Sequence, residues 1–267
     1  NIHDTAHSIP SIVLGRDITK FKTIYKNKKI SRNFFDKEQE IISTDFNSSI
    51  FSQIGKEGKS IYINGWYYPY CQIVKSYNEC FTNYYSWEKS SYNFNFLLMF
   101  NLYKLVPFRV FLLDKHIYSF NNYTFEFNEA IKSHKYSVKN FLDSLNQEFD
   151  FYFYHTSYPH HPYIFDGKKK TYIKKYLDNS SYKENIIMTD LTLGKIIKTL
   201  KSKNKFEDAL IIISSDHPLK DKDPSKNYEK PVLLIKNRNQ IHGRTINEKV
   251  YNFQLKDIVL YKVFNSS

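Results

Sequence analysis

Short hydrophobic runs separated by polar turns predict four β-strands in this chain. The runs are rich in β-branched and aromatic residues, and they span residues 60–64 (SIYIN), 149–155 (FDFYFYH), 209–214 (ALIIIS) and 231–236 (PVLLIK). The last two runs are almost continuously apolar, which is typical of strands buried on both faces. The pattern therefore predicts a mainly parallel central sheet that is flanked by helices on both faces.

A helical pattern lies between the second and third runs, over residues 182–201. It places Ile186, Leu193, Ile197 and Leu200 on one face and lysines elsewhere. Strand, helix and strand in this order predict a right-handed crossover. The sequence has no internal repeats, and its seven glycines leave little room for a flexible linker. We therefore expect a single α/β domain over residues 1–267.

The most apolar stretch covers residues 94–113 (FNFLLMFNLYKLVPFRVFLL), where polar residues and Pro107 interrupt the apolar run. Two interpretations are open: an amphipathic helix on a membrane surface, or a buried helix broken near Pro107. No run of about 18 apolar residues is uninterrupted, so the sequence predicts no bilayer span. The chain begins at Asn1 without Met, which indicates a processed or truncated piece of a longer protein.

The net charge changes the functional expectation only slightly. Lys and Arg total 39 against 27 Asp and Glu, which gives +12. Only five of these cations are Arg, the side chain best suited to bidentate hydrogen bonds with bases and phosphates. The composition argues against a nucleic-acid partner and leaves a mild preference for anionic surfaces or substrates.

The chain has two cysteines, Cys71 and Cys80. Their spacing fits a small loop disulfide formed in an oxidising compartment, and it also fits two reduced, partly buried thiols. The spacing slightly favours the disulfide.

Side chains capable of catalysis follow two of the predicted strands, at the place where open α/β sheets bind ligands. Asp216 and His217 come directly after the third run, and their oxygen and nitrogen donors suit Zn or Mn. The alternative for this pair is a solvated turn. His155, His160 and His161 end or follow the second run, and such a cluster suits phosphate binding or proton transfer. The alternative is a Pro-stiffened loop with incidental histidines.

Hydroxyl side chains gather at the beginning of the chain, where Thr5, Ser8 and Ser11 lead into an apolar run. At the start of a helix such hydroxyls lie beside unpaired N–H groups and the positive end of the helix dipole. This arrangement binds oxyanions such as phosphate. The alternative is an ordinary Ser or Thr at the N-cap.

These three segments, in this order, resemble the sulfatase and alkaline-phosphatase-like superfamily, and specifically its bacterial membrane-anchored phosphotransferases. Residues 5–10 (TAHSIP) resemble the nucleophile segment of phosphoethanolamine transferases, and residues 13–16 (VLGR) resemble the end of the sulfatase nucleophile helix. Counting back from this end places Thr5 on the nucleophile. The resemblance extends from residue 1 to about residue 260 through residues 58–71 (GKSIYINGWYYPYC), 158–162 (YPHHP), 215–217 (SDH) and 230–236 (KPVLLIK).

The resemblance implies an alkaline-phosphatase-like α/β fold that lacks its opening strand in this chain, and a divalent metal, Zn or Mn, as the cofactor. The implied metal ligands are Asp216, His217 and Thr5, together with a carboxylate upstream of Asn1. Thr5 is the implied nucleophile and forms a phospho-threonine. His160 is implied in catalysis, and the implied substrate-binding residues are His160, His155 and Ser8.

The implied reaction is the transfer or hydrolysis of phospho-substituents, of the phosphoethanolamine or phosphoglycerol type, on an anionic cell-surface lipid or glycan. Segments upstream of this chain would anchor the protein to the bacterial inner membrane. The domain would then act in the periplasm or on the extracytoplasmic face of that membrane, which agrees with a disulfide between Cys71 and Cys80.

Two departures from the family pattern leave alternatives open. Pro218 and Leu219 replace the Gly-Glu that usually follows Ser-Asp-His, which favours a degenerate domain that binds an anionic glycan without turnover. Ile12 stands where the formylglycine motif of sulfatases has Arg, which argues against a sulfate-ester hydrolase, the other alternative.

Overall fold

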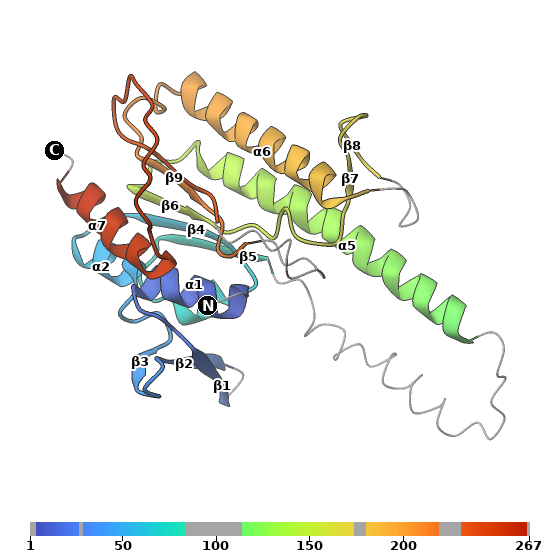
Figure 1. Ribbon diagram of the computed structural model, residues 1–267, viewed down its shortest axis with the longest axis horizontal. Helices are drawn as coiled ribbons and strands as arrows, with labels where there is room; N and C mark the ends of the chain where they lie inside the picture. Colours follow the sequence, from blue (N-terminus) through green and yellow to red (C-terminus); the bar gives the residue numbers. More distant parts are fainter. Residues whose placement is uncertain (1–3, 27–28, 84–113, 174–179, 219–230, 266–267) are drawn as a thin grey trace.

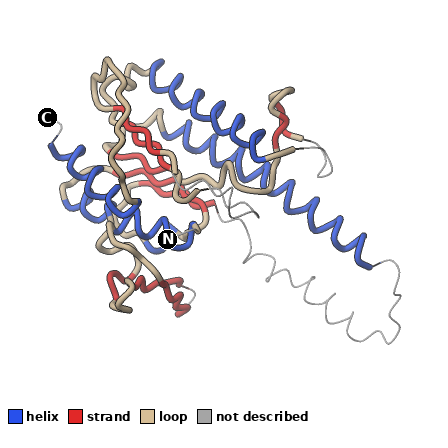
Figure 2. Tube along the Cα trace, in the orientation of Figure 1, coloured by secondary structure: helices blue, strands red, loops and turns tan. Residues whose placement is uncertain are grey.

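The computed structural model describes residues 4–26, 29–83, 114–173, 180–218 and 231–265 of the chain. A small parallel sheet lies at its centre, between two groups of helices (Figures 1 and 2). Helices α5 (Asp114–Ser144) and α6 (Tyr182–Ser202) lie on one side of this sheet. On the other side are α1 (Thr5–Leu14), α2 (Ile50–Lys56) and α7 (Leu255–Asn265).

The central sheet has three strands in the order β5-β4-β6, and both pairings are parallel. Its members are β4 (Ile61–Trp66), β5 (Glu79–Asn83) and β6 (Phe151–Tyr154). The middle strand β4 is buried over its first five residues, as expected for a strand covered on both faces. The predicted strands over residues 60–64 and 149–155 are thus confirmed, and so is the helix predicted over residues 182–201.

Alternate residues of β4 face two different cores. Ile61 and Ile63 pack in the larger core, which also contains residues of α1 and α2. Tyr62 points the other way and packs with Phe141 and Leu145 of the long helix and the turn after it. Because successive side chains of β4 point to opposite faces, helices cover the strand on both sides. The site lies at the carboxyl end of the strand.

A second, antiparallel sheet lies beside the beginning of the chain. It consists of β1 (Lys20–Lys26), β2 (Lys29–Phe35) and β3 (Ile41–Thr44) in that order. Phe34 of β2 is fully buried and stacks on Phe46, which attaches this sheet to the larger core. The hydrophobic pattern did not predict this sheet.

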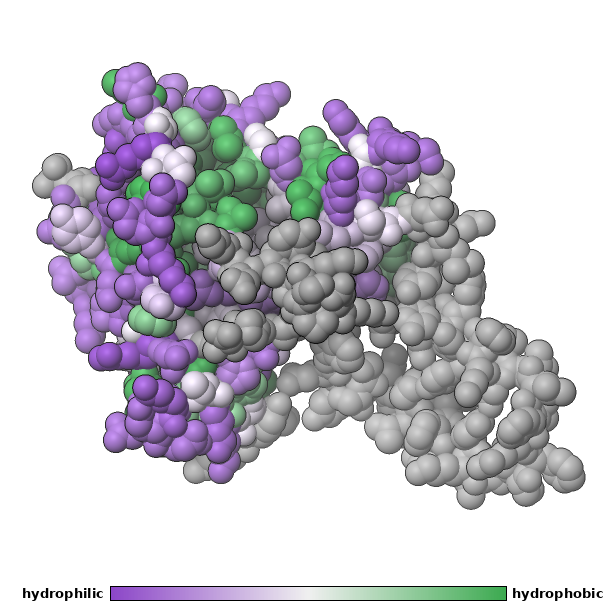
Figure 3. Space-filling model, viewed as in Figure 1, coloured by the Kyte–Doolittle hydropathy of each residue, from purple (hydrophilic) through white to green (hydrophobic). Residues whose placement is uncertain are grey.

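The strands predicted over residues 209–214 and 231–236 form, but their arrangement differs from the prediction. They are β9 (Ile211–Ser214) and β10 (Leu233–Lys236), and they pair antiparallel with each other in a sheet of two. Leu234 is 56% exposed, and hydrophobic surface lies over this region (Figure 3). Burial on both faces was therefore wrong for these strands, because an apolar run fixes neither strand direction nor the cover on each face.

Two finer expectations also change. The connection from β6 through α6 to β9 joins two separate described sheets, so it is not a crossover within one sheet. On α6, Ile186 is 43% exposed, while Asn185 and Met188 are buried, so the buried face is rotated from the predicted one. The stretch 94–113 lies outside the described residues. Within the described ranges, no helix has the length and apolar character needed to cross a bilayer.

The remaining described elements are short and position the site. They are α3 (Tyr70–Ile73), the hairpin of β7 (Phe165–Asp166) and β8 (Thr171–Tyr172), and the 3-10 turn η2 (Asn252–Gln254). The turn η2 packs against α1, which brings the end of the chain next to its beginning.

Candidate functional site

Helix α1 begins at Thr5, and the preceding residue, Asp4, is its N-cap. The Asp4 carboxylate accepts a hydrogen bond from the backbone N–H of His7 at 3.0 Å, and it contacts the His7 ring nitrogen Nδ1 at 2.7 Å. The capping residue is therefore an aspartate, and the expectation of an ordinary Ser or Thr cap was wrong. Since Asp4 performs the capping, the Thr5 hydroxyl is not needed for it.

The C-terminal end of α1 explains why a glycine follows the apolar run. Gly15 adopts φ +68°, the left-handed region, and its N–H donates to the carbonyl oxygen of Ser11 at 3.0 Å. A Cβ at this position would approach the Lys256 side chain to 2.8 Å. The position therefore requires glycine both for backbone conformation and for space.

The two candidate hydroxyls on α1 differ in accessibility. Thr5 is partly exposed, whereas Ser8 is fully buried, and its Oγ has no hydrogen-bond partner among the described residues. The carbonyl oxygen of Ala6, between them, accepts a hydrogen bond from the buried Tyr68 hydroxyl. Thr5 is thus the hydroxyl that a substrate can reach directly. Contact of Ser8 with a substrate stays a prediction.

The turn after β4 carries the next part of the site. At Gly65 an added Cβ would lie 2.0 Å from the Tyr70 ring, so only glycine lets this ring pack on the strand. Tyr67 adopts φ +72°, an uncommon conformation for a residue with a side chain. The Tyr70 hydroxyl contacts Nδ1 of His155 at 2.8 Å.

His155, at the end of β6, is held from several sides. Its ring also hydrogen-bonds the backbone of Trp66, and burial lowers the pKa of His155 from its usual value to about 4, although the Asp216 charge raises it. Burial also raises the pKa of Tyr70 well above its usual range, so Tyr70 keeps its proton and donates to Nδ1. The neutral ring then carries its own proton on Nε2. These partners give His155 a positioning role, and substrate contact by this residue stays a prediction.

Asp216 and His217 follow β9, as the sequence predicted. Oδ2 of Asp216 is buried without a hydrogen-bond partner in the described ranges, and it lies 3.8 Å from Nε2 of His217. Nδ1 of His217 contacts the Pro218 carbonyl oxygen at 2.8 Å and must donate to it. The neutral ring therefore has its lone pair on Nε2, facing the carboxylate.

This pair fits a divalent metal. An open carboxylate oxygen and a neutral imidazole nitrogen are the donors that Zn and Mn accept, and each binds such an ion at about 2.1 Å. Their separation of 3.8 Å is less than twice that distance, so one ion can touch both. A group of three or more His, Cys, Asp or Glu ligands is not found among the described residues. Thr5 as a further ligand stays a prediction.

Asp216 is connected to the other parts of the site. The side-chain amide of Asn252, in η2, donates to its carbonyl oxygen. Because η2 packs on α1, this bond connects the loop after β9 to helix α1. The Asp216 charge also raises the pKa values of Tyr70 and His155. Tyr70 and His155 are thus near enough to Asp216 to feel its charge.

The loop after β6 presents His160 and His161 to solvent on different sides. The His160 ring lies 6.4 Å from the Trp66 ring, whereas the His161 ring lies 5.3 Å from Tyr163. Nδ1 of His160 contacts the carbonyl oxygen of His161 at 2.6 Å, so the neutral ring has its lone pair on Nε2. The Trp66 ring lies between His160 and His155, since its centre is also 5.7 Å from the His155 ring.

Asn185 holds this loop in place, and the sequence reasoning missed it. Its amide nitrogen contacts the carbonyl oxygens of Pro159, His160 and Pro162 at 3.0–3.4 Å, and its Oδ1 accepts from the Ile164 N–H at 3.0 Å. Asn185 is fully buried on α6. The available signal was a polar residue within the apolar pattern of a helix.

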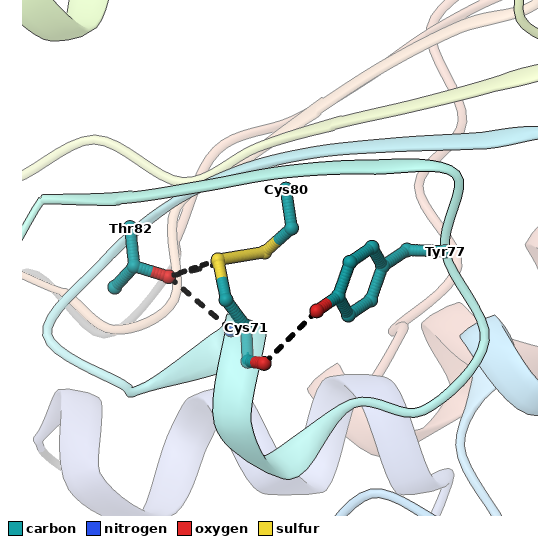
Figure 4. The surroundings of a disulfide bond; sticks show 4 residues. All are labelled: Cys71, Tyr77, Cys80 and Thr82. Atoms are coloured by element: carbon teal, nitrogen blue, oxygen red, sulfur yellow. Dashed lines mark hydrogen bonds between the residues drawn. A yellow bond between two sulfur atoms is a disulfide. The ribbon is translucent and has the colours of Figure 1, made fainter.

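A disulfide joins Cys71 to Cys80, with 5.6 Å between the Cα atoms, and it connects α3 to β5 (Figure 4). The Thr82 hydroxyl contacts Sγ of Cys71 at 2.9 Å and accepts from its backbone N–H at 3.3 Å. The Tyr77 hydroxyl donates to the Cys71 carbonyl oxygen at 3.1 Å. This cluster fixes the segment that follows Tyr70, and with it the partner of His155.

A comparison with protein families supports the same interpretation. The family model described as Sulfatase matches residues 5–252, which include every element of the site. No curated protein and no solved structure matches the chain significantly. The match begins at the first residue of α1 and ends in η2, the two elements that pack together beside Asp216. This chain belongs to the sulfatase family, whose members have an α/β alkaline-phosphatase-like fold and act on sulfate or phosphate esters.

Proposed function

We propose that this chain is a metal-dependent enzyme that transfers or hydrolyses phospho-substituents of the phosphoethanolamine or phosphoglycerol type on a cell-surface lipid or glycan. The observation that carries the proposal is the Asp216 carboxylate oxygen, which is buried, has no hydrogen-bond partner among the described residues and lies 3.8 Å from His217 Nε2. A buried carboxylate normally has a hydrogen-bond or ionic partner. An ion at this place provides one.

Thr5 is the proposed nucleophile. It is the accessible hydroxyl at the start of α1, and the first-turn N–H groups and helix dipole favour negative charge on a group bound there. A divalent ion held by Asp216 and His217 would supply a Lewis acid, which lowers the pKa of a hydroxyl bound to it.

The proposed chemistry has two displacements at phosphorus. First, Thr5 loses its proton to solvent, its Oγ–P bond forms, and the bond between phosphorus and the leaving oxygen breaks. His160, protonated on Nε2, gives that proton to the leaving oxygen. The neutral Nε2 then takes the proton of the acceptor hydroxyl, or of water, as this oxygen attacks the phospho-threonine. Thr5 leaves with a proton from solvent and is regenerated.

The disulfide and the net charge of the chain agree with this proposal. The Cys71–Cys80 disulfide is of a kind that persists in oxidising compartments, which supports a periplasmic or extracytoplasmic site of action. The net charge of +12 favours an anionic lipid or glycan as the substrate. Anchoring to the inner membrane through segments upstream of Asn1 is part of the same proposal.

The test is a trapped intermediate. Protein that contains the upstream segments is incubated with a phosphoethanolamine or phosphoglycerol lipid donor, quenched in acid and digested. Mass spectrometry should find the phospho-group on the peptide that contains Thr5. Thr5→Ala should abolish both label and transfer, whereas Ser8→Ala should leave a measurable rate. Label on Ser8 would overturn the assignment. Donor binding without any label would favour a domain that binds without turnover.

A further inference from the structure

Arg32 lies in the middle of β2, and aromatic rings surround its guanidinium. The guanidinium carbon is 4.6 Å from the centre of the Tyr68 ring and 5.4 Å from that of Phe21. The backbone N–H of Arg32 donates to Oδ1 of Asp45 at 2.7 Å, which fixes the strand at this residue. Ring faces attract a cation at these distances, so the side chain is held in one place.

Two nitrogens of this guanidinium lack partners. Nε and Nη1 are buried and have no hydrogen-bond partner in the part of the chain that the structure describes. Arg32 also forms no ion pair with any described carboxylate. Arg remains charged at every physiological pH, and buried charges in proteins are normally paired. Buried donors on a permanent cation therefore indicate an anionic ligand.

Aromatic rings connect Arg32 to the first turn of α1. The guanidinium lies against the Tyr68 ring, and the hydroxyl of Tyr68 donates to the Ala6 carbonyl oxygen. Phe21, the second ring beside the guanidinium, lies 5.7 Å from the ring of His7 on α1. Arg32 is thus one tyrosine side chain away from the residue that follows Thr5.

A second open group lies on the same helix. Ser8 is fully buried, and its Oγ finds no partner among the residues described. Arg32 and Asp216 also act on one hydroxyl, because the pKa of Tyr70 is lowered by the first and raised by the second. A guanidinium with open donors, beside the positive end of a helix dipole, suits a tetrahedral oxyanion.

We propose that Arg32 binds the tetrahedral oxyanion of the substrate, a phosphate or sulfate ester, at the start of α1. This inference rests on the proposed function, because it assigns the charged group of the substrate to the same site. A planar guanidinium with several donors suits such an oxyanion better than a lysine ammonium does. The antiparallel sheet thereby acquires a role in substrate recognition.

The experiment measures binding of inorganic phosphate and inorganic sulfate to the purified chain by titration calorimetry. Arg32→Met should weaken binding of the preferred anion about 10- to 100-fold, because charge-assisted hydrogen bonds are lost. Arg32→Lys should recover part of the affinity. Lys22→Met is the matched control, because Lys22 is an exposed cation on the neighbouring strand β1, and it should change the affinity less than about twofold. Comparing the two anions tells which ester class the site prefers.

Two results would overturn the inference: failure of the wild-type chain to bind either anion, or unchanged affinity in a folded Arg32→Met protein. If Arg32→Met does not fold, Arg32→Lys is tested instead. An affinity of Arg32→Lys equal to that of the wild-type protein would also refute the inference. Thr5→Ala should still bind the anion. Arg32-dependent binding in a protein that never labels Thr5 would reject the proposed function and leave this inference standing.

Discussion

Oδ2 of Asp216 and Nε2 of His217 face each other at a distance at which one ion can touch both, and this makes the metal the first prediction at the residue scale. Purified protein should contain Zn or Mn above background by elemental analysis. Asp216→Ala combined with His217→Ala should reduce the content to background. The control is Asp208→Ala, which changes an exposed carboxylate before β9. Equal metal in all three proteins would mean that the pair does not bind it.

His160 and His161 allow a comparison within one loop. Both are exposed, but His160 lies toward Trp66 and the site, while His161 lies toward Tyr163. His160→Ala should lower the transfer rate about 10²- to 10⁴-fold, the range for general acid–base groups. His161→Ala should lower it far less. Steady-state rates with one lipid donor check this, and equal losses would show that the loop acts as a whole.

Sequence reasoning can propose site residues whose position is marked locally, and it misses residues whose role depends on distant partners. Thr5, Asp216 and His217 stand at a helix start or a strand end, positions that a pattern indicates. Arg32 stands out only once its surroundings are known, because only the structure shows that two buried guanidinium nitrogens have no hydrogen-bond partner among the described residues. Asn185 is similar, since its four contacts come from a loop more than 20 residues earlier in the chain.

At the scale of elements, α6 positions the loop that carries His160 through Asn185. Asn185→Ala removes the partner of one buried N–H and of three carbonyl oxygens, so the free energy of unfolding should fall by about 2–4 kcal/mol. Asp190→Ala, an exposed change on the same helix, should stay within about 0.5 kcal/mol. Urea unfolding measures both. Two similar values would show that the loop holds its position without Asn185.

The disulfide between α3 and β5 closes a short loop with a sequence separation of 9. Loop-closure entropy for this length gives about 2–3 kcal/mol of stabilisation. The Cys71→Ala, Cys80→Ala double variant should lose that amount in urea unfolding. Reducing agent should have a similar effect on the wild-type protein and none on the variant. A variant as stable as the oxidised protein would contradict this expectation.

The strands were easier to predict than their partners. The run over residues 60–64 forms a central strand, and its burial on both faces agrees with its apolar character. The runs over residues 209–214 and 231–236 have the same character but pair antiparallel with exposed positions, because partner choice depends on the path of the chain between them. The first sheet was missed because three of the seven residues of β1 are lysines, which leaves too few apolar side chains for a hydrophobic run.

At the scale of the whole molecule, a buried histidine makes stability depend on pH. Burial and the Lys195 charge lower the pKa of His134 from its usual value to about 4, and its described neighbours include the Tyr158 and Tyr172 rings. The unfolded chain takes up this proton near pH 6.5, so the contribution of His134 is intact above that pH and is lost as pH falls toward 4. The loss is about 3 kcal/mol.

His134→Gln isolates this effect, because every other titrating group is common to both proteins. Urea unfolding at pH 7.5, 5.5 and 4.5 should show stability falling less steeply with acid in the variant than in the wild type. Parallel curves for the two proteins would show that His134 does not supply the dependence.

The packing of η2 on α1 means that the candidate site combines residues from the two ends of the family domain. Thr5 leaves the ribosome long before Asp216, and the amide of Asn252 that donates to the Asp216 loop follows later still. A growing chain therefore lacks the complete candidate site for most of its synthesis. A single proteolytic cut that releases the segment beyond β10 should silence the enzyme while the central parallel sheet persists. We therefore expect activity only from a chain that still contains the segment beyond β10.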